Sequence, residues 1–163
     1  PAKWDKLYKN LQTLDSMPSN IIGWLAFTVT AYNVNHMIDF MKWKLTESGF
    51  SKINSTKRRP VITHHVAHHP QHLNIRVLPD EAKEKLTKRF EEFVKWVETN
   101  GYEEHVVKHA RDIAQGVCKY MNSESYYATH WEEFKRYTKR LDAIRDENLF
   151  DVEPAFKDYI DEL

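Results

Sequence analysis

The apolar residues in the first part of the chain follow a helical period and then a strand period. From Trp4 to Leu14 they recur every three or four positions, which predicts a helix that ends before Pro18. The next run, Ser19 to Tyr32, alternates like a strand but is apolar on both of its faces. Such strands are typical of parallel sheets, which bury both faces beneath helices. We therefore expect both faces of this strand to be covered.

A helix and a second strand follow. Asn35 is suited to cap a helix whose apolar stripe continues to Gly49. A polar, basic linker then leads to a run of high strand propensity, Val61–Val66. The short alternating run Leu73–Val77 predicts a third strand. The order strand, helix, strand is typical of a parallel pair joined by a crossover helix.

The second half of the chain has helical periodicity throughout. It predicts three amphipathic helices, Asp80–Asn100, Tyr102–Met121 and Ser125–Arg145, and an acidic tail, Asp146–Leu163. Pro79 lies at the start of the first helix and Gly101 lies just past its end, as is usual at helix boundaries.

These elements predict a helix-rich α/β fold. Its sheet is a partial parallel sheet of two or three strands, a fragment of a barrel, backed by helices, and its C-terminal half is a set of three helices. A length of 163 residues suits one domain. We divide that domain into an α/β portion, residues 1–78, and a helical portion, residues 79–163.

Composition narrows the classes of partner. Lys and Arg number 24 and Asp and Glu number 24, so the chain has no basic excess that would attract nucleic acid or an anionic membrane. No apolar run approaches the roughly 18 residues of a membrane span. The single cysteine, Cys118, cannot form an internal disulfide. We expect a cytoplasmic protein in which Cys118 is a small core residue.

A cluster of histidines is the most conspicuous local feature. The cluster comprises His64, His65, His68, His69 and His72. On a strand, His64 and His68 would share a face, and neutral imidazole is a common ligand of transition metals. His64 and His68 are therefore the candidate metal ligands. The alternative is a polar strand end with exposed imidazoles, which the absence of a nearby carboxylate or cysteine at fixed spacing favours.

The end of the first strand supplies a second set of candidates. Open and closed α/β sheets place their ligands at the carboxyl ends of strands. Thr28 and Thr30 lie at that end, and Asn33 and Asn35 follow it directly.

Three stretches together carry a resemblance to a known family. They are Phe27–His36 with the helix after it, Leu78-Pro79 with Lys83, and Phe134–Arg145 followed by Asn148 and Glu153-Pro154. The first contains the pattern TVxAxN and the third the pattern FxxYTxxLDxxR. Over nearly its whole length, the chain resembles the C-terminal part of the twitch-type radical SAM proteins found in phage and marine metagenomic sequences.

The resemblance implies a cofactor chemistry that this chain lacks the ligands to support alone. Such proteins bind a [4Fe–4S] cluster through a CxxxCxxC loop and use it to cleave S-adenosylmethionine. With one cysteine, this chain has no such loop, so we expect no cofactor and no catalytic residue in the chain by itself. The resemblance implies that Thr28, Thr30 and Asn33 lie beside S-adenosylmethionine in a complete protein, with the N-terminal half missing here.

Three hypotheses for the function follow. In the first, the chain is the non-catalytic C-terminal portion of a radical SAM-like protein. In the second, it is an interaction module that forms a homodimer and covers the open side of its partial sheet. In the third, it is a histidine-based metal-binding protein.

Overall fold

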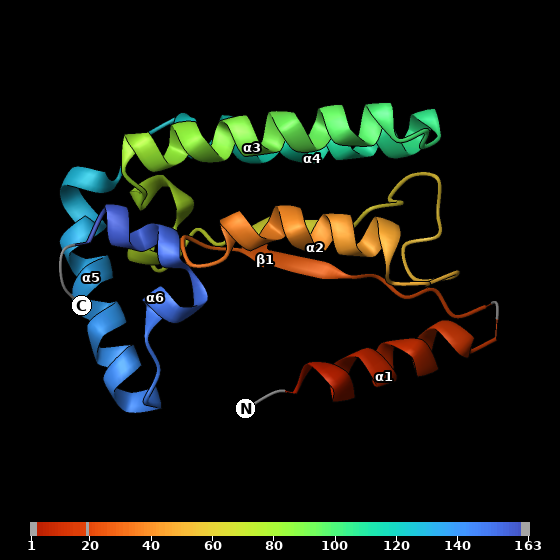
Figure 1. Cartoon of the computed structure of the whole chain (residues 1–163), viewed down its shortest axis with the longest axis horizontal. Helices are drawn as coiled ribbons and strands as arrows, with labels where there is room; N and C mark the ends of the chain where they lie inside the picture. Colours follow the sequence, from red (N-terminus) through yellow and green to blue (C-terminus); the bar gives the residue numbers. More distant parts are fainter. Residues whose placement is uncertain (1–2, 19, 161–163) are drawn as a thin grey trace.

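The structure is a computed structural model that describes residues 3–18 and 20–160 (Figure 1). In chain order, its elements are helix α1 (Trp4–Ser16), strand β1 (Ala26–Val29), helix α2 (Val34–Thr46), strand β2 (Thr63–Val66), 3-10 helices η1 (Gln71–Leu73) and η2 (Ile75–Val77), helices α3 (Asp80–Thr99), α4 (Glu104–Asn122), α5 (Tyr127–Arg145) and α6 (Leu149–Val152), and 3-10 helix η3 (Pro154–Asp158). This order confirms the helix-rich α/β fold.

The sheet in the described residues has two parallel strands. β1 pairs with β2 in the register Ala26 to Thr63 and Val29 to Val66, and α2 connects them. The predicted parallel pair is therefore confirmed, although β1 occupies only four residues of the predicted strand Ser19–Tyr32. The first residue of that prediction, Ser19, lies outside the described residues.

The two faces of the sheet differ in burial. Leu25 and Val29 lie on the inner face and are buried, and Phe27 packs its ring 5.5 Å from that of Phe40 in α2. On the outer face, the side chains of Ala26 and Thr28 are exposed, and Trp24 keeps 42% of its surface. The expectation that both faces are covered is wrong, because helix packing buries only the inner face.

The predicted third strand is also wrong. Residues Leu73–Val77 form parts of η1 and η2 instead of a strand. The Asn74 side chain accepts a hydrogen bond from the Arg76 N–H at 3.0 Å, which stabilises a tight turn in competition with an extended chain. Ile75 and Val77 are fully buried in spite of this, so their alternation reflects burial and not strand geometry.

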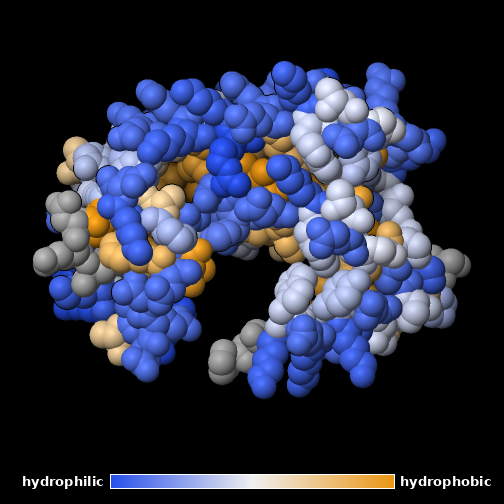
Figure 2. All heavy atoms as spheres, in the orientation of Figure 1, coloured by the Kyte–Doolittle hydropathy of each residue, from blue (hydrophilic) through white to orange (hydrophobic). Residues whose placement is uncertain are grey.

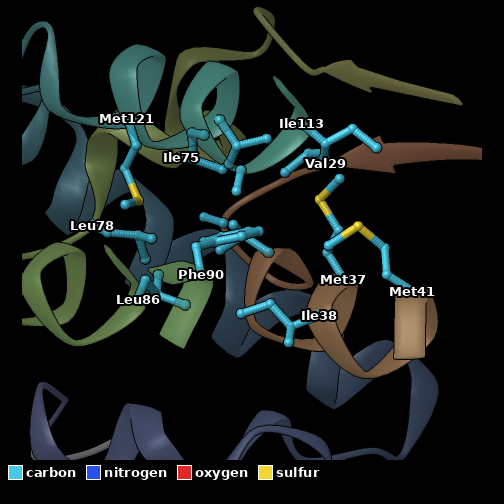
Figure 3. Close-up of a cluster of buried hydrophobic side chains, with 14 of the residues drawn as sticks. Val29, Met37, Ile38, Met41, Ile75, Leu78, Leu86, Phe90, Ile113 and Met121 are labelled. Atoms are coloured by element: carbon cyan, nitrogen blue, oxygen red, sulfur yellow. The ribbon is translucent and has the colours of Figure 1, made fainter. Parts of the chain in front are cut away.

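One hydrophobic core joins the α/β portion to the helical portion. Figure 3 shows the side chains of Val29, Met37 and Met41 turned toward the same interior as Phe90 of α3 and Ile113 of α4. All five of these side chains have at most 2% of their surface exposed. The two portions therefore fold around a shared core.

The molecule is indented on one side. Figure 1 shows α3 and α4 side by side, with α1 at one end of the molecule and α5 and α6 at the other. Figure 2 shows an open gap between these two ends. Within the described residues, the tail after α5 docks on the protein, since Leu149, Phe156 and Ile160 are buried. The part of the chain that the structure describes contains no helix both long and apolar enough to cross a membrane.

Candidate functional site

The three residues predicted beside a cofactor meet where β1 ends and the loop to α2 begins. The Asn33 side-chain oxygen accepts hydrogen bonds from the Thr30 N–H at 2.8 Å and the Thr30 hydroxyl at 3.2 Å. The Asn33 amide nitrogen donates to the Thr28 carbonyl at 3.0 Å. Asn33 thus closes the turn from β1 into α2, and its side-chain oxygen and nitrogen are engaged by Thr30 and Thr28, respectively.

A cavity of about 180 Å³ lies beside this loop, at the carboxyl end of β1. The beginnings of α2 and α3 and the C-terminal segment around η3 line it, and it opens to solvent. Its apolar lining is made by Ala31, Val34, Leu78, Ala82, Leu86 and Phe156. Figure 3 shows two of these side chains, Leu78 and Leu86, lying next to each other at one end of the core. The floor of the cavity is therefore supported by the core.

A polar network crosses the cavity wall. The Asn35 amide nitrogen donates to Oε2 of Glu153 at 2.8 Å, and its oxygen accepts from Arg89. α2 begins at Val34, so Asn35 lies inside the helix and the prediction that it caps the helix is wrong. Its side chain instead connects the first turn of α2 with α3 and the C-terminal tail.

Glu153 and Arg89 belong to this site, and the pattern of the sequence predicts neither of them there. The side chain of Glu153 is only 6% exposed, although it lies in an acidic tail where carboxylates are usually solvated. The Nε2 atom of His36 lies 3.2 Å from Oε2 of Glu153, the same oxygen that Asn35 contacts. Glu153 and Asn35 are 118 positions apart in the sequence, so only the folded chain brings them together.

The two candidate metal ligands, His64 and His68, lie near different residues of α4. His64 shares a small hollow with His109, and His68 contacts the Tyr120 hydroxyl at 2.9 Å. His109 and Tyr120 are eleven residues apart on α4, about 16 Å at the helical rise. Among the described residues, no group of three or more His, Cys, Asp or Glu side chains is arranged to hold a metal ion.

The environment of His64 and His109 favours neutral imidazoles. Burial lowers the pKa of His64, and the neighbouring His65 lowers it further. Burial is also the main cause that lowers the pKa of His109. The Nδ1 atom of His109 accepts a hydrogen bond from the Val61 N–H at 3.3 Å, which requires an unprotonated Nδ1. This hydrogen bond joins α4 to the residues just before β2.

Cys118 is half-buried on α4. Burial raises the pKa of its thiol to about 11, although a hydrogen bond with Thr87 lowers it in part. The thiolate is the reactive form of cysteine, so Cys118 is unreactive near neutral pH.

Comparisons of the chain with known protein families, with curated proteins and with solved structures yield no match. Its function must therefore be argued from the geometry.

Proposed function

We propose that the chain is a non-catalytic portion of a larger radical SAM-like protein, in which further strands complete its sheet. The observation that supports this most directly is the incomplete parallel sheet. The carbonyl of Leu25 accepts a hydrogen bond from the Thr63 N–H in β2, and that of Val29 accepts one from the Ala67 N–H directly after β2. The backbone groups of Ala26 and Thr28 therefore face away from β2, since alternate residues of a strand face opposite edges. No other described strand pairs with either edge of the sheet.

The segment before β1 is also incompletely covered. Its exposed apolar residues are Met17, Ile21, Ile22 and Trp24, with between 37% and 53% of their surfaces accessible. Exposed apolar side chains beside a strand edge that no described strand pairs with are typical of an interface. Neighbouring barrel strands would cover both the edge and these side chains.

In the proposed larger protein, the cluster and cofactor chemistry that the resemblance implies belongs to a part outside this chain. In a complete protein, the CxxxCxxC loop would hold the [4Fe–4S] cluster, and S-adenosylmethionine would lie near Thr28, Thr30 and Asn33. These residues fit such a position because they lie at the carboxyl end of β1. One cysteine in the present chain is too few for a cluster.

The proposal predicts two results. The reading frame upstream of Pro1 should encode a CxxxCxxC loop. Anaerobic reconstitution of the present chain with iron and sulfide should leave no stoichiometric cluster and no cleavage of S-adenosylmethionine, because the thiolates are too few. An upstream frame that encodes no such loop would contradict the proposal, and so would a cluster assembled on this chain alone.

A homodimer is the second candidate function, and the open edge of β1 favours it. Two copies of β1 could pair antiparallel about a two-fold axis and form a four-stranded sheet, with Trp24 near the interface. Light scattering should then show a dimer at micromolar concentration, and Trp24→Ser should shift it toward monomer. Tyr127→Ser is the matched control, since Tyr127 in α5 is also 42% exposed. A monomer at high micromolar concentration would exclude this candidate.

A further inference from the structure

Glu153 is a buried carboxylate that uses only one of its two oxygens. Asn35 and His36 both contact Oε2, at 2.8 and 3.2 Å. Within residues 3–18 and 20–160, no donor contacts Oε1. Among the described residues, Oε1 is not one of the buried side-chain atoms that lack a hydrogen-bond partner, so solvent can reach it. Glu153 lines the cavity at the end of β1, so a molecule in that cavity can reach it.

The cations around the cavity are engaged with other acids. Lys85 pairs with Glu81 at 3.0 Å and with Asp158 at 3.3 Å. Arg89 lies 3.4 Å from Asp39 and also donates to Asn35. The contacts of Glu153 are a neutral amide and a histidine that is charged only when protonated. Within the part of the chain that the structure describes, the Glu153 carboxylate is therefore the charged group at this cavity that has no fixed counterion. Its negative charge disfavours an anionic ligand.

The size and lining of the cavity limit the rest of the ligand. An apolar cavity of about 150 Å³ accommodates a benzene ring. The present cavity, at about 180 Å³, is slightly larger and is lined mostly by aliphatic side chains and by Phe156. It can hold one ring or a short branched alkyl group with a single polar substituent.

We propose that this cavity binds a small primary ammonium compound with a compact apolar body. The ammonium group donates to Oε1 of Glu153 and supplies the missing positive charge. The apolar body lies against Leu78, Leu86 and Phe156. A primary ammonium has three donors, and hydrogen bonds between an ammonium and a carboxylate are stronger than those between neutral groups. This inference is independent of whether the chain belongs to a larger protein.

Benzylamine, benzyl alcohol and benzoate test the charge requirement, since they share a ring and differ in the polar group. We expect titration with benzylamine to shift the methyl NMR signals of Ala82 and Ala155, both of which line the cavity. Benzyl alcohol should bind at least tenfold more weakly, and benzoate should not compete. The methyl shifts report binding in the unmodified protein and so require no variant to fold.

Two variants test the role of Glu153. Glu153→Gln retains the shape and an acceptor for Asn35, and it should weaken benzylamine binding at least tenfold by calorimetry. Asp151→Asn is the control, because it removes an equal charge from an exposed position of the same segment. Equal binding of benzylamine and benzoate would overturn the proposal, as would unchanged binding in Glu153→Gln or the absence of methyl shifts at millimolar benzylamine.

Discussion

Substitution of Phe134 with alanine is expected to lower the free energy of unfolding by about 3–5 kcal/mol, the usual cost of removing a buried phenylalanine. Phe134 has none of its surface exposed. Its ring centre lies 5.0 Å from that of Trp131, 5.0 Å from that of Tyr32 and 5.5 Å from that of Phe156. Phe134 therefore joins α5 both to the loop after β1 and to the C-terminal tail.

The Phe134→Ala substitution should also disturb the candidate site. Phe156 lines the cavity and packs on Phe134, so a void at residue 134 removes the support of one cavity wall. Urea denaturation followed by circular dichroism measures the change in stability. Ile144→Ala on the same helix is the control, because Ile144 is 83% exposed and should change stability by less than about 0.5 kcal/mol. A loss below about 1 kcal/mol for Phe134→Ala would show that the aromatic cluster does not support the fold in this way.

The long helices of the second half could be predicted from the sequence because their signals are local. The prediction Asp80–Asn100 compares with the observed Asp80–Thr99. Gly101, just past that helix, adopts a left-handed backbone angle, φ 74°, which favours glycine. The periodic apolar stripes and the boundary residues lie within the helices that they define, so neither depends on distant parts of the chain.

The sheet was less predictable because a strand depends on its neighbours. The run from Ile21 to Trp24 has the composition of a strand, but no described strand pairs with it, and Ile21, Ile22 and Trp24 remain exposed in an irregular segment. The run Leu73–Val77 alternates like a strand, yet the side chain of Asn74 favours a turn. The residue types of a segment indicate whether it is buried and how strongly it favours a strand. They do not indicate whether another strand is available to pair with it.

The sequence predicts where the candidate site lies in the fold, but only some of the residues that form it. Position at the end of a strand identified Thr28, Thr30 and Asn33, and these residues do meet where β1 ends. The same argument identified neither Glu153 nor Arg89. Each of these two contacts Asn35 from a distant part of the chain, so their roles depend on how the helices pack.

Substitution of Asp15 with asparagine is expected to loosen α1 and to remove an acid-sensitive part of the stability. None of the residues of α1 is fully buried, and its apolar contacts come from partly exposed side chains such as Leu11 and Leu14. The Asp15 carboxylate accepts hydrogen bonds from the backbone N–H groups of Ser51, Lys52 and Ile53, each at 2.8 Å, and from the Ser51 hydroxyl at 3.0 Å. It therefore fastens the end of α1 to the loop after α2.

The pKa of Asp15 determines the sign of the pH dependence. Burial alone would raise this pKa, but the hydrogen bonds from Ser51, Ile53 and Lys52 outweigh burial and lower it from 3.8 to about 2. The carboxylate therefore stabilises the fold above pH 3.8, and this stabilisation is lost as the pH falls through about 2. We expect it to contribute about 1–2 kcal/mol at neutral pH, since Asp15 remains partly solvated and screened.

Hydrogen exchange measures this contribution locally. At neutral pH, the amides of Ser51, Lys52 and Ile53 should exchange faster in Asp15→Asn than in the unmodified protein. This difference should disappear as the pH falls from about 4 to about 2, because protonation of Asp15 then weakens the same hydrogen bonds. Asp5→Asn, which removes an equal charge from the exposed start of α1, should leave these amides protected. Equal exchange at neutral pH in Asp15→Asn and Asp5→Asn would contradict the prediction, and α1 would then be held by the packing of Trp4 and Tyr8 against Trp43.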